Sequence, residues 1–106
     1  MNKERRATLA TILIEMDDIS ASTLTEAQTI AANFSTRVDA LREQEDEAYG
    51  NIPENLMYTE RAETMESNID AFQTAVDILD EAVDAEDVDA VLENIQEAKS
   101  ALEEIE

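Results

Sequence analysis

The sequence predicts an all-α fold, and three observations support this prediction. Glycine and proline occur once each in 106 residues, while Ala, Glu, Asp, Leu and Ile dominate. Apolar residues recur at steps of three and four, which is the spacing of one helix face. The single Gly and the single Pro lie in one short segment, residues 49–58. Together they predict a long helical hairpin or a four-helix bundle with coiled-coil-like packing, as one domain spanning residues 1–106.

Residues 3–48 form the first predicted arm. Its apolar and small residues keep roughly helical spacing at Leu9, Ile12, Met16, Ile19, Thr23, Ala27, Ile30, Phe34, Val38, Leu41 and Ala48. The Ser and Thr residues of segment 20–25 weaken a helix locally, and Thr23 with Glu26 fits a capping box. The arm is therefore either one helix of about 46 residues, roughly 69 Å long, or two helices broken near residue 20.

The segment 49–58 contains the strongest turn signal, Gly50 and Pro53. It joins the first arm to a second of similar length, residues 59–105, as a helical hairpin. Its apolar side chains either cover the end of the bundle or anchor a partner, since Tyr and Met are favoured at interface centres.

The second arm begins with the clearest heptad pattern. Ala62, Met65, Ile69, Phe72, Val76, Leu79 and Val83 follow steps of three and four, and Ala75 and Ala82 widen this apolar seam. Thr59 is the expected N-cap. The pattern resumes at Val88, Val91, Ile95, Ala98, Leu102 and Ile105 after a step of five. This loss of phase predicts a helix break near residues 84–87.

The predicted hairpin sets the two arms in register. It places the break near residue 20 level with the break at 84–87, so both arms could bend there and close a four-helix bundle. An unbent rod would pair with a second copy to cover its apolar stripe. The hairpin also places the basic residues Lys3, Arg5 and Arg6 beside the acidic residues Glu103, Glu104 and Glu106.

The residue types that are missing exclude several kinds of chemistry. The chain has no Cys and no His, which excludes disulfides, the usual zinc sites, Glu-x-x-His di-iron sites and His-dependent triads. No cofactor and no metal site is expected. No apolar run approaches the roughly 18 residues of a membrane span, and no signal-peptide pattern is present. A cytoplasmic location is the expectation.

Charge is distributed very unevenly along the chain. The formal net charge is −20, of which residues 1–42 carry −1 and residues 43–106 carry −19. Such an excess argues against binding to nucleic acid and indicates a surface that meets something basic.

Part of this charge forms one stripe beside the apolar seam of the second arm. Its positions are Glu63, Glu66, Asp70, Gln73, Asp77, Asp80 and Asp84, so six of the seven are carboxylates. The stripe spans about 31 Å, close to the roughly 34 Å of one turn of B-DNA. A solvated face that maintains solubility is one interpretation. The other is a binding surface that imitates a phosphate backbone, with Tyr49 and Tyr58 as secondary contacts.

An enzymatic interpretation rests on two pairs of carboxylates. Glu63 with Glu66, and Glu81 with Asp84, resemble the Mg²⁺-binding motifs of all-α nucleotide pyrophosphohydrolases. With 27 acidic residues in the chain, such pairs arise by chance, and few Lys or Arg residues are available to hold a triphosphate. The chain is therefore not expected to be an enzyme.

Residues 45–56, followed by Thr59, Glu60 and Arg61, resemble a pattern in small acidic helical proteins of bacterial phages and mobile elements. In that pattern an acidic helix end runs into an aromatic–x–Asn–x–Pro–Glu–x–Leu loop and then a Ser-Glu-Arg-like helix start. Gly50 and Thr59 replace the commoner Asp and Ser. The resemblance implies an anti-CRISPR or anti-restriction type of protein, some of which mimic DNA. The expected partner is a basic nucleic-acid-binding protein, a CRISPR effector or a restriction nuclease. The alternative is a coiled-coil assembly or adaptor protein without an inhibitory role.

Overall fold

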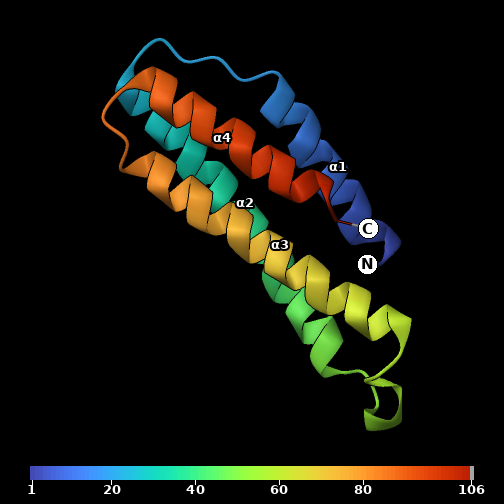
Figure 1. The fold of residues 1–106 in the computed structure, drawn as a ribbon. Coiled ribbons are helices and arrows are strands. Elements are labelled where there is room, and N and C mark those ends of the chain that lie inside the picture. Colours follow the sequence, from blue (N-terminus) through green and yellow to red (C-terminus); the bar gives the residue numbers. More distant parts are fainter. Residues whose placement is uncertain (106) are drawn as a thin grey trace.

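The computed structural model describes residues 1–105 and shows four helices packed against one another (Figure 1). They are α1 (Lys3–Asp17), α2 (Leu24–Gly50), α3 (Glu60–Val83) and α4 (Val88–Glu103), with a 3₁₀ turn η1 (Glu54–Leu56) between α2 and α3. Consecutive helices run in opposite directions. The predicted all-α class is confirmed, and of the two predicted forms the molecule adopts the four-helix bundle.

Each helix begins at a side chain that accepts a backbone hydrogen bond from its first turn. Thr23 Oγ1 accepts from Glu26 N at 3.1 Å, and Thr59 Oγ1 accepts from Ala62 N at 3.3 Å, as predicted for both positions. Asn2 caps α1 and Asp87 caps α4 in the same way. These caps satisfy N–H groups that have no partner within the helix.

The first arm is broken, and its break lies level with the break in the second arm. Gln28 Nε2 donates a hydrogen bond of 3.1 Å to the carbonyl of Ala85, which ties the start of α2 to the α3–α4 connection. Both breaks therefore lie at one end of the bundle (Figure 1). This excludes the single first helix of 46 residues and confirms the predicted register of the hairpin.

The turn between the arms is shorter than predicted. Helix α2 continues through Tyr49 and Gly50, and Asn51 N donates to the carbonyls of Glu47 and Ala48 at its end. No described residue has a positive φ, so the single glycine is not used for a left-handed turn. Pro53 marks the actual turn, where its fixed φ starts η1.

The predicted seam of the second arm is buried inside the molecule. The contiguous apolar core consists of Leu9, Ile12, Met16, Ala27, Ala31, Phe34, Val38, Leu41, Phe72, Ala75, Val76, Leu79, Ala82, Val91, Ile95, Ala98 and Leu102. All four helices contribute to it. Because the seam packs within one chain, an apolar stripe that required a second copy to cover it does not arise.

The four helices differ in length, which divides the molecule into two ends. Helices α2 and α3 have 27 and 24 residues, whereas α1 and α4 have 15 and 16. The longer pair extends past both chain termini (Figure 1). We call residues 42–71 the hairpin end and the remainder the four-helix end. The longest dimension of the molecule is 51 Å, against 22 and 18 Å across it.

A buried carboxylate lies where the two ends meet. The side chain of Glu45 is fully buried and accepts a hydrogen bond of 3.0 Å from Arg5 Nε and one of 3.4 Å from Asn68 Nδ2. The Met1 ammonium lies 3.8 Å from the same carboxylate. Since a buried charge is tolerated only when it is paired and hydrogen-bonded, these contacts attach the start of α1 to the hairpin.

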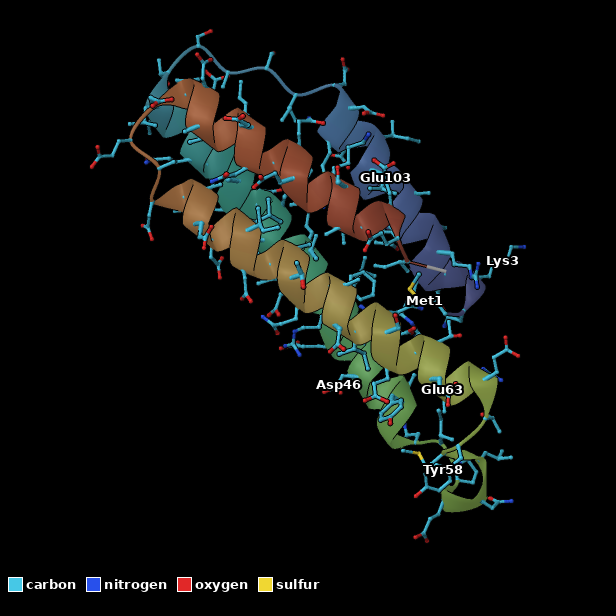
Figure 2. All side chains as sticks on the ribbon, in the orientation of Figure 1. Met1, Lys3, Asp46, Tyr58, Glu63 and Glu103 are labelled. Carbon is cyan, nitrogen blue, oxygen red and sulfur yellow. The ribbon has the colours of Figure 1, made fainter. Side chains whose placement is uncertain are left out.

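This arrangement corrects the predicted contact between the two chain ends. Arg5 pairs with Glu45, and Arg6 Nε donates to the carbonyl of Met1, so no ion pair joins Lys3, Arg5 or Arg6 to the last acidic residues within the described chain. Figure 2 shows Lys3 at the outer side of the first helical turn. Glu106 lies outside the described residues. The prediction failed because it considered helix direction and not the burial of Glu45.

Two further ion pairs attach α1 to the rest of the bundle. Arg37 donates hydrogen bonds to both carboxylate oxygens of Glu15, which lowers the pKa of Glu15 and raises the pKa of Arg37. Lys99 Nζ lies 2.6 Å from Asp17 and 3.0 Å from Glu103, and these hydrogen bonds raise the pKa of Lys99. All of these groups are partly exposed, so each pair contributes little to stability.

Candidate protein-interaction face

All seven predicted stripe positions of α3 lie on its exposed side, and six of them carry a carboxylate. They are Glu63, Glu66, Asp70, Gln73, Asp77, Asp80 and Asp84. The structure thus places the predicted binding carboxylates of α3 in one row on the surface. The helix makes the row continuous because its members alternate at steps of three and four.

The six stripe carboxylates form no ion pair in the described part of the chain. The side-chain cations that do pair, Arg5, Arg37, Arg42 and Lys99, lie on α1, α2 and α4, and they and the Met1 ammonium contact acidic residues of those helices. Two stripe members accept hydrogen bonds from neutral groups. Gln73 Nε2 donates to Asp77 at 3.0 Å, and Ser35 Oγ donates to Asp80 at 2.6 Å. The negative charge of the row is therefore not neutralised within the molecule.

The C-terminal part of the row is placed against the preference of the helix dipole. Asp80 and Glu81 lie in the last turn of α3 and Asp84 is its C-cap, where the partial charge of the helix is negative. None of the four α-helices has a basic residue in its last turn. The acidic charge here does not stabilise the helix, so helix stability does not account for it.

A second row on α2 runs alongside the stripe. Ser35, Asp39, Arg42, Asp46 and Tyr49 share one helix face because they follow steps of four and three. The bond between Ser35 and Asp80 places one end of this row against α3, and Tyr49 shares a hollow with Glu63 at the other end. Asp46 thereby adds an exposed carboxylate (Figure 2). We define the acidic face as the six carboxylates of the α3 stripe together with Asp46.

Arg42 is the one cation within the α2 row, and it is already occupied. Its Nε lies 2.8 Å from Asp39, and its Nη2 lies 3.8 Å from Glu43. Hydrogen bonding to Asp39 raises the pKa of Arg42. Since two carboxylates surround it, Arg42 does not make the face positive.

The acidic face ends in a hollow at the tip of the hairpin. This tip hollow has a volume of about 480 Å³ and is lined by Tyr49, Glu54, Met57, Tyr58, Glu63 and Glu66. It brings together four of the eight residues predicted from the sequence: both tyrosines and the first two stripe carboxylates. The other four, Asp70, Asp77, Asp80 and Asp84, continue the row away from it along α3.

The tip exposes apolar side chains that a closed turn would cover. The side chain of Tyr58 is 93% exposed and that of Leu56 is 45% exposed, whereas Ile52, Met57 and Tyr49 are half-buried. The exposure divides the residues of this segment into two groups. The half-buried residues cover the end of the hairpin, and the two exposed ones are free to contact a partner.

Sequence reasoning missed two members of this site. Asp46 and Glu54 were not among the predicted contacts, although Asp46 shares the helix face of Tyr49. Met57 belongs to the turn segment whose apolar side chains were expected either to cover the end of the bundle or to anchor a partner. The face that carries Asp46 was detectable from the spacing of α2 alone. The approach of Glu54 and Met57 to α3 was not, because it depends on the path of the turn around Pro53.

The carboxylate pairs that resemble a pyrophosphohydrolase motif both lie on the surface of α3. Glu63 and Glu66 are exposed at the start of the helix, while Glu81 and Asp84 are exposed at its end, about 27 Å away. Within residues 1–105 no group of three or more acidic, His or Cys side chains is arranged to hold a metal ion.

Among residues 1–105, no helix combines the length and apolar character needed to cross a membrane.

The geometry of this face is best suited to contact with a cationic surface. It offers six carboxylates in a row, none of which pairs with a cation of the described chain, and aromatic residues at one end. Comparison with protein-family models, with curated proteins and with solved structures finds no match to this chain.

Proposed function

We propose that this chain inhibits a host defence nuclease by occupying the basic channel in which that enzyme holds nucleic acid. The observation that carries the proposal is the row of six exposed carboxylates on α3, none of which pairs with a cation of the described chain. A channel lined by Lys and Arg binds nucleic acid largely through release of counterions. A row of fixed carboxylates would use the same interaction.

The charge density of the molecule supports this mimicry. A net charge of −20 over a longest dimension of 51 Å corresponds to one net charge per about 2.6 Å. Duplex DNA carries one charge per about 1.7 Å of axis, and a single strand one per about 3.4 Å. The charge density of the whole molecule therefore lies between those of duplex and single-stranded DNA. The α3 row alone carries fewer charges per unit length, so mimicry of DNA also needs neighbouring carboxylates such as Asp46.

The tip of the hairpin supports a defined orientation of binding. Tyr58 is almost fully exposed beside the tip hollow, which also contains three glutamates. A tyrosine ring next to carboxylates suits a guanidinium group, since Arg both pairs with acids and stacks on aromatic faces. The first target we propose is a CRISPR effector, in which arginines read the short duplex motif beside the target sequence. The resemblance of residues 45–61 to phage and mobile-element proteins favours this class.

The test is inhibition of DNA cleavage by a Cas9-type effector loaded with guide RNA, with a restriction endonuclease as a second target. We expect inhibition at about 50 mM salt and a large loss of it at about 300 mM, because the contact is ionic. Replacing Glu66, Asp70 and Asp77 together by Lys should abolish inhibition. Asp80 is left unchanged because it accepts a hydrogen bond from Ser35, and Glu63 because its charge favours the start of α3.

A second triple variant tests whether inhibition depends on the arrangement of the carboxylates or only on the net charge of the chain. Replacing Glu86, Glu93 and Glu97 by Lys makes the same change in charge at exposed positions outside the acidic face. This control should retain inhibition. Equal loss in both variants would show that only total charge matters. No inhibition of either nuclease by the unaltered chain, with circular dichroism showing a folded protein, would refute the proposal.

A further inference from the structure

Three of the seven basic residues form no ion pair in the described chain, although the sequence contains 27 acidic residues. They are Lys3, Arg6 and Arg61, of which Arg6 donates a hydrogen bond of 3.2 Å to the carbonyl of Met1. The other basic residues each pair with a carboxylate: Arg5, Arg37, Arg42 and Lys99. An exposed arginine that has no carboxylate partner is a cation that an external anion can reach.

Two of these unpaired cations, Arg6 and Arg61, line one hollow between the start of α1 and the start of α3. This hollow has a volume of about 380 Å³. It is also lined by Glu60, which forms no ion pair with either arginine in the described chain. Two arginines and one glutamate give the lining side chains a net charge of +1, within a chain whose net charge is −20. We call this feature the arginine hollow.

A second hollow, which is mainly apolar, adjoins the first at Arg61. It has a volume of about 470 Å³, and Arg61 lines both hollows. Four of its seven lining residues are apolar: Ala48, Ile52, Pro53 and Leu56. Asn51 and Thr59 are neutral, so among the described residues that line this hollow the one with a charge is Arg61. We call this feature the apolar hollow.

The apolar hollow and the tip hollow lie on opposite sides of the start of α3. Arg61 and Glu63 are two positions apart, which rotates them by about 200° around the helix axis. Arg61 lines the apolar hollow, whereas Glu63 and Glu54 line the tip hollow. A ligand in the apolar hollow would therefore leave the acidic face uncovered.

The two adjoining hollows together specify the chemistry of a ligand. A recess of several hundred Å³ with a mainly apolar lining and one charged group is typical of small-molecule sites. A guanidinium at its edge favours a carboxylate, which it can bind through two parallel hydrogen bonds. A cationic ligand would meet two arginines here, while unpaired carboxylates are available to it on the acidic face. Because charges more than about 8 Å apart are largely screened at physiological salt, the arginines at the hollows outweigh the distant acidic residues.

We propose that these hollows bind a small amphiphilic anion, with an aliphatic chain in the apolar hollow and a carboxylate on Arg61 and Arg6. The aliphatic chain would cover Leu56, whose side chain is 45% exposed, and so remove apolar surface from water. The exposed side-chain amide of Asn51 offers the carboxylate one more hydrogen-bond donor. This site shares no residue with the acidic face, so it does not depend on the function proposed above.

Titration of the isotope-labelled full chain with sodium octanoate, followed by amide chemical shifts at constant ionic strength, tests the proposal. We expect shifts in residues 48–56 and 59–65, with a dissociation constant on the order of millimolar. Sodium acetate has the same charged group without the aliphatic chain, and it should produce no comparable shifts at the same concentrations.

Replacing Arg61 by Gln should raise the dissociation constant of octanoate about tenfold or more, because the carboxylate loses its charged partner. Replacing Lys3 by Gln is the matched control, since it removes the same charge from another exposed, unpaired cation that lines neither hollow, and it should leave octanoate binding unchanged. Arg61 is exposed, so the variant should remain folded, which circular dichroism checks. Octanoate binding that R61Q leaves unchanged, equal binding of acetate, or shifts confined to other parts of the molecule would overturn the proposal.

Discussion

The two ends of this bundle are stabilised by different interactions. The four-helix end contains the contiguous apolar core, to which all four helices contribute. In the hairpin end the buried side chains outside that core are Ala62 and Met65, together with the polar Glu45 and Asn68. The comparison shows that two helices alone bury little apolar surface, and that the hairpin end buries a hydrogen-bonded carboxylate among its few buried side chains.

This difference places the proposed binding site on the less stable end. The tip hollow and the start of the acidic face belong to the hairpin end, where few apolar contacts hold the helices together. Binding segments are commonly drawn from regions of low local stability. We therefore expect backbone amides of residues 60–68 to exchange with solvent faster than those of residues 72–80.

The largest expected effect comes from the core of the four-helix end. Replacing Phe72, which is fully buried, by Ala should lower the free energy of unfolding by about 3–5 kcal/mol. Replacing Met65 in the hairpin end by Ala should lower the free energy of unfolding by about 2 kcal/mol, because fewer neighbours surround the cavity that remains. Urea denaturation of both variants measures the difference. Equal losses would show that the two ends are equally well packed.

The buried carboxylate should have the next largest effect. Replacing Glu45 by Ala removes the carboxylate that pairs with Arg5 and accepts a hydrogen bond from Asn68, and we expect a loss of roughly 3 kcal/mol in the free energy of unfolding. Glu47, which is exposed and forms no ion pair in the described chain, provides the control, and its replacement by Ala should change the value by less than about 0.5 kcal/mol. If the two variants were equally stable, the carboxylate would not attach α1 to the hairpin.

The smallest expected effect is a gain in stability at the tip. Gly50 is the last residue of α2, has no positive φ, and a Cβ atom built on it meets no other atom within 4 Å. Replacing it by Ala should raise the free energy of unfolding by about 0.4–1 kcal/mol, mainly by restricting the unfolded chain. The urea midpoint measures this gain. A destabilised variant would mean that the end of α2 requires the freedom of glycine after all.

Helix positions and caps were predictable because they depend on short-range spacing. The seam from Ala62 to Val83, the cap at Thr59 and the break at 84–87 all agree with the structure. The exposed row on α3 was predictable for the same reason, because a helix with a buried seam must turn its other positions to solvent. The mimicry proposed for that row remains a prediction.

The contacts of individual charges were not predictable. Glu45 continues the spacing of Phe34, Val38 and Leu41, but as an acidic residue it was not included in the apolar pattern of the first arm. Only the structure shows Arg5, 40 residues earlier, beside it. The pairing expected between the chain ends failed for the same reason, because the path of α1 across the hairpin depends on that buried contact.

The sequence by itself determined that this chain forms amphipathic helices, where most of them begin and end, and that its negative charge is concentrated after residue 42. Helix periodicity and capping act over a few residues, so they can be read along the chain. The tertiary structure decided that the first arm bends, that Glu45 is buried and that Arg5 pairs with it. Those features depend on which helix faces meet, and contacts between residues distant in sequence decide that.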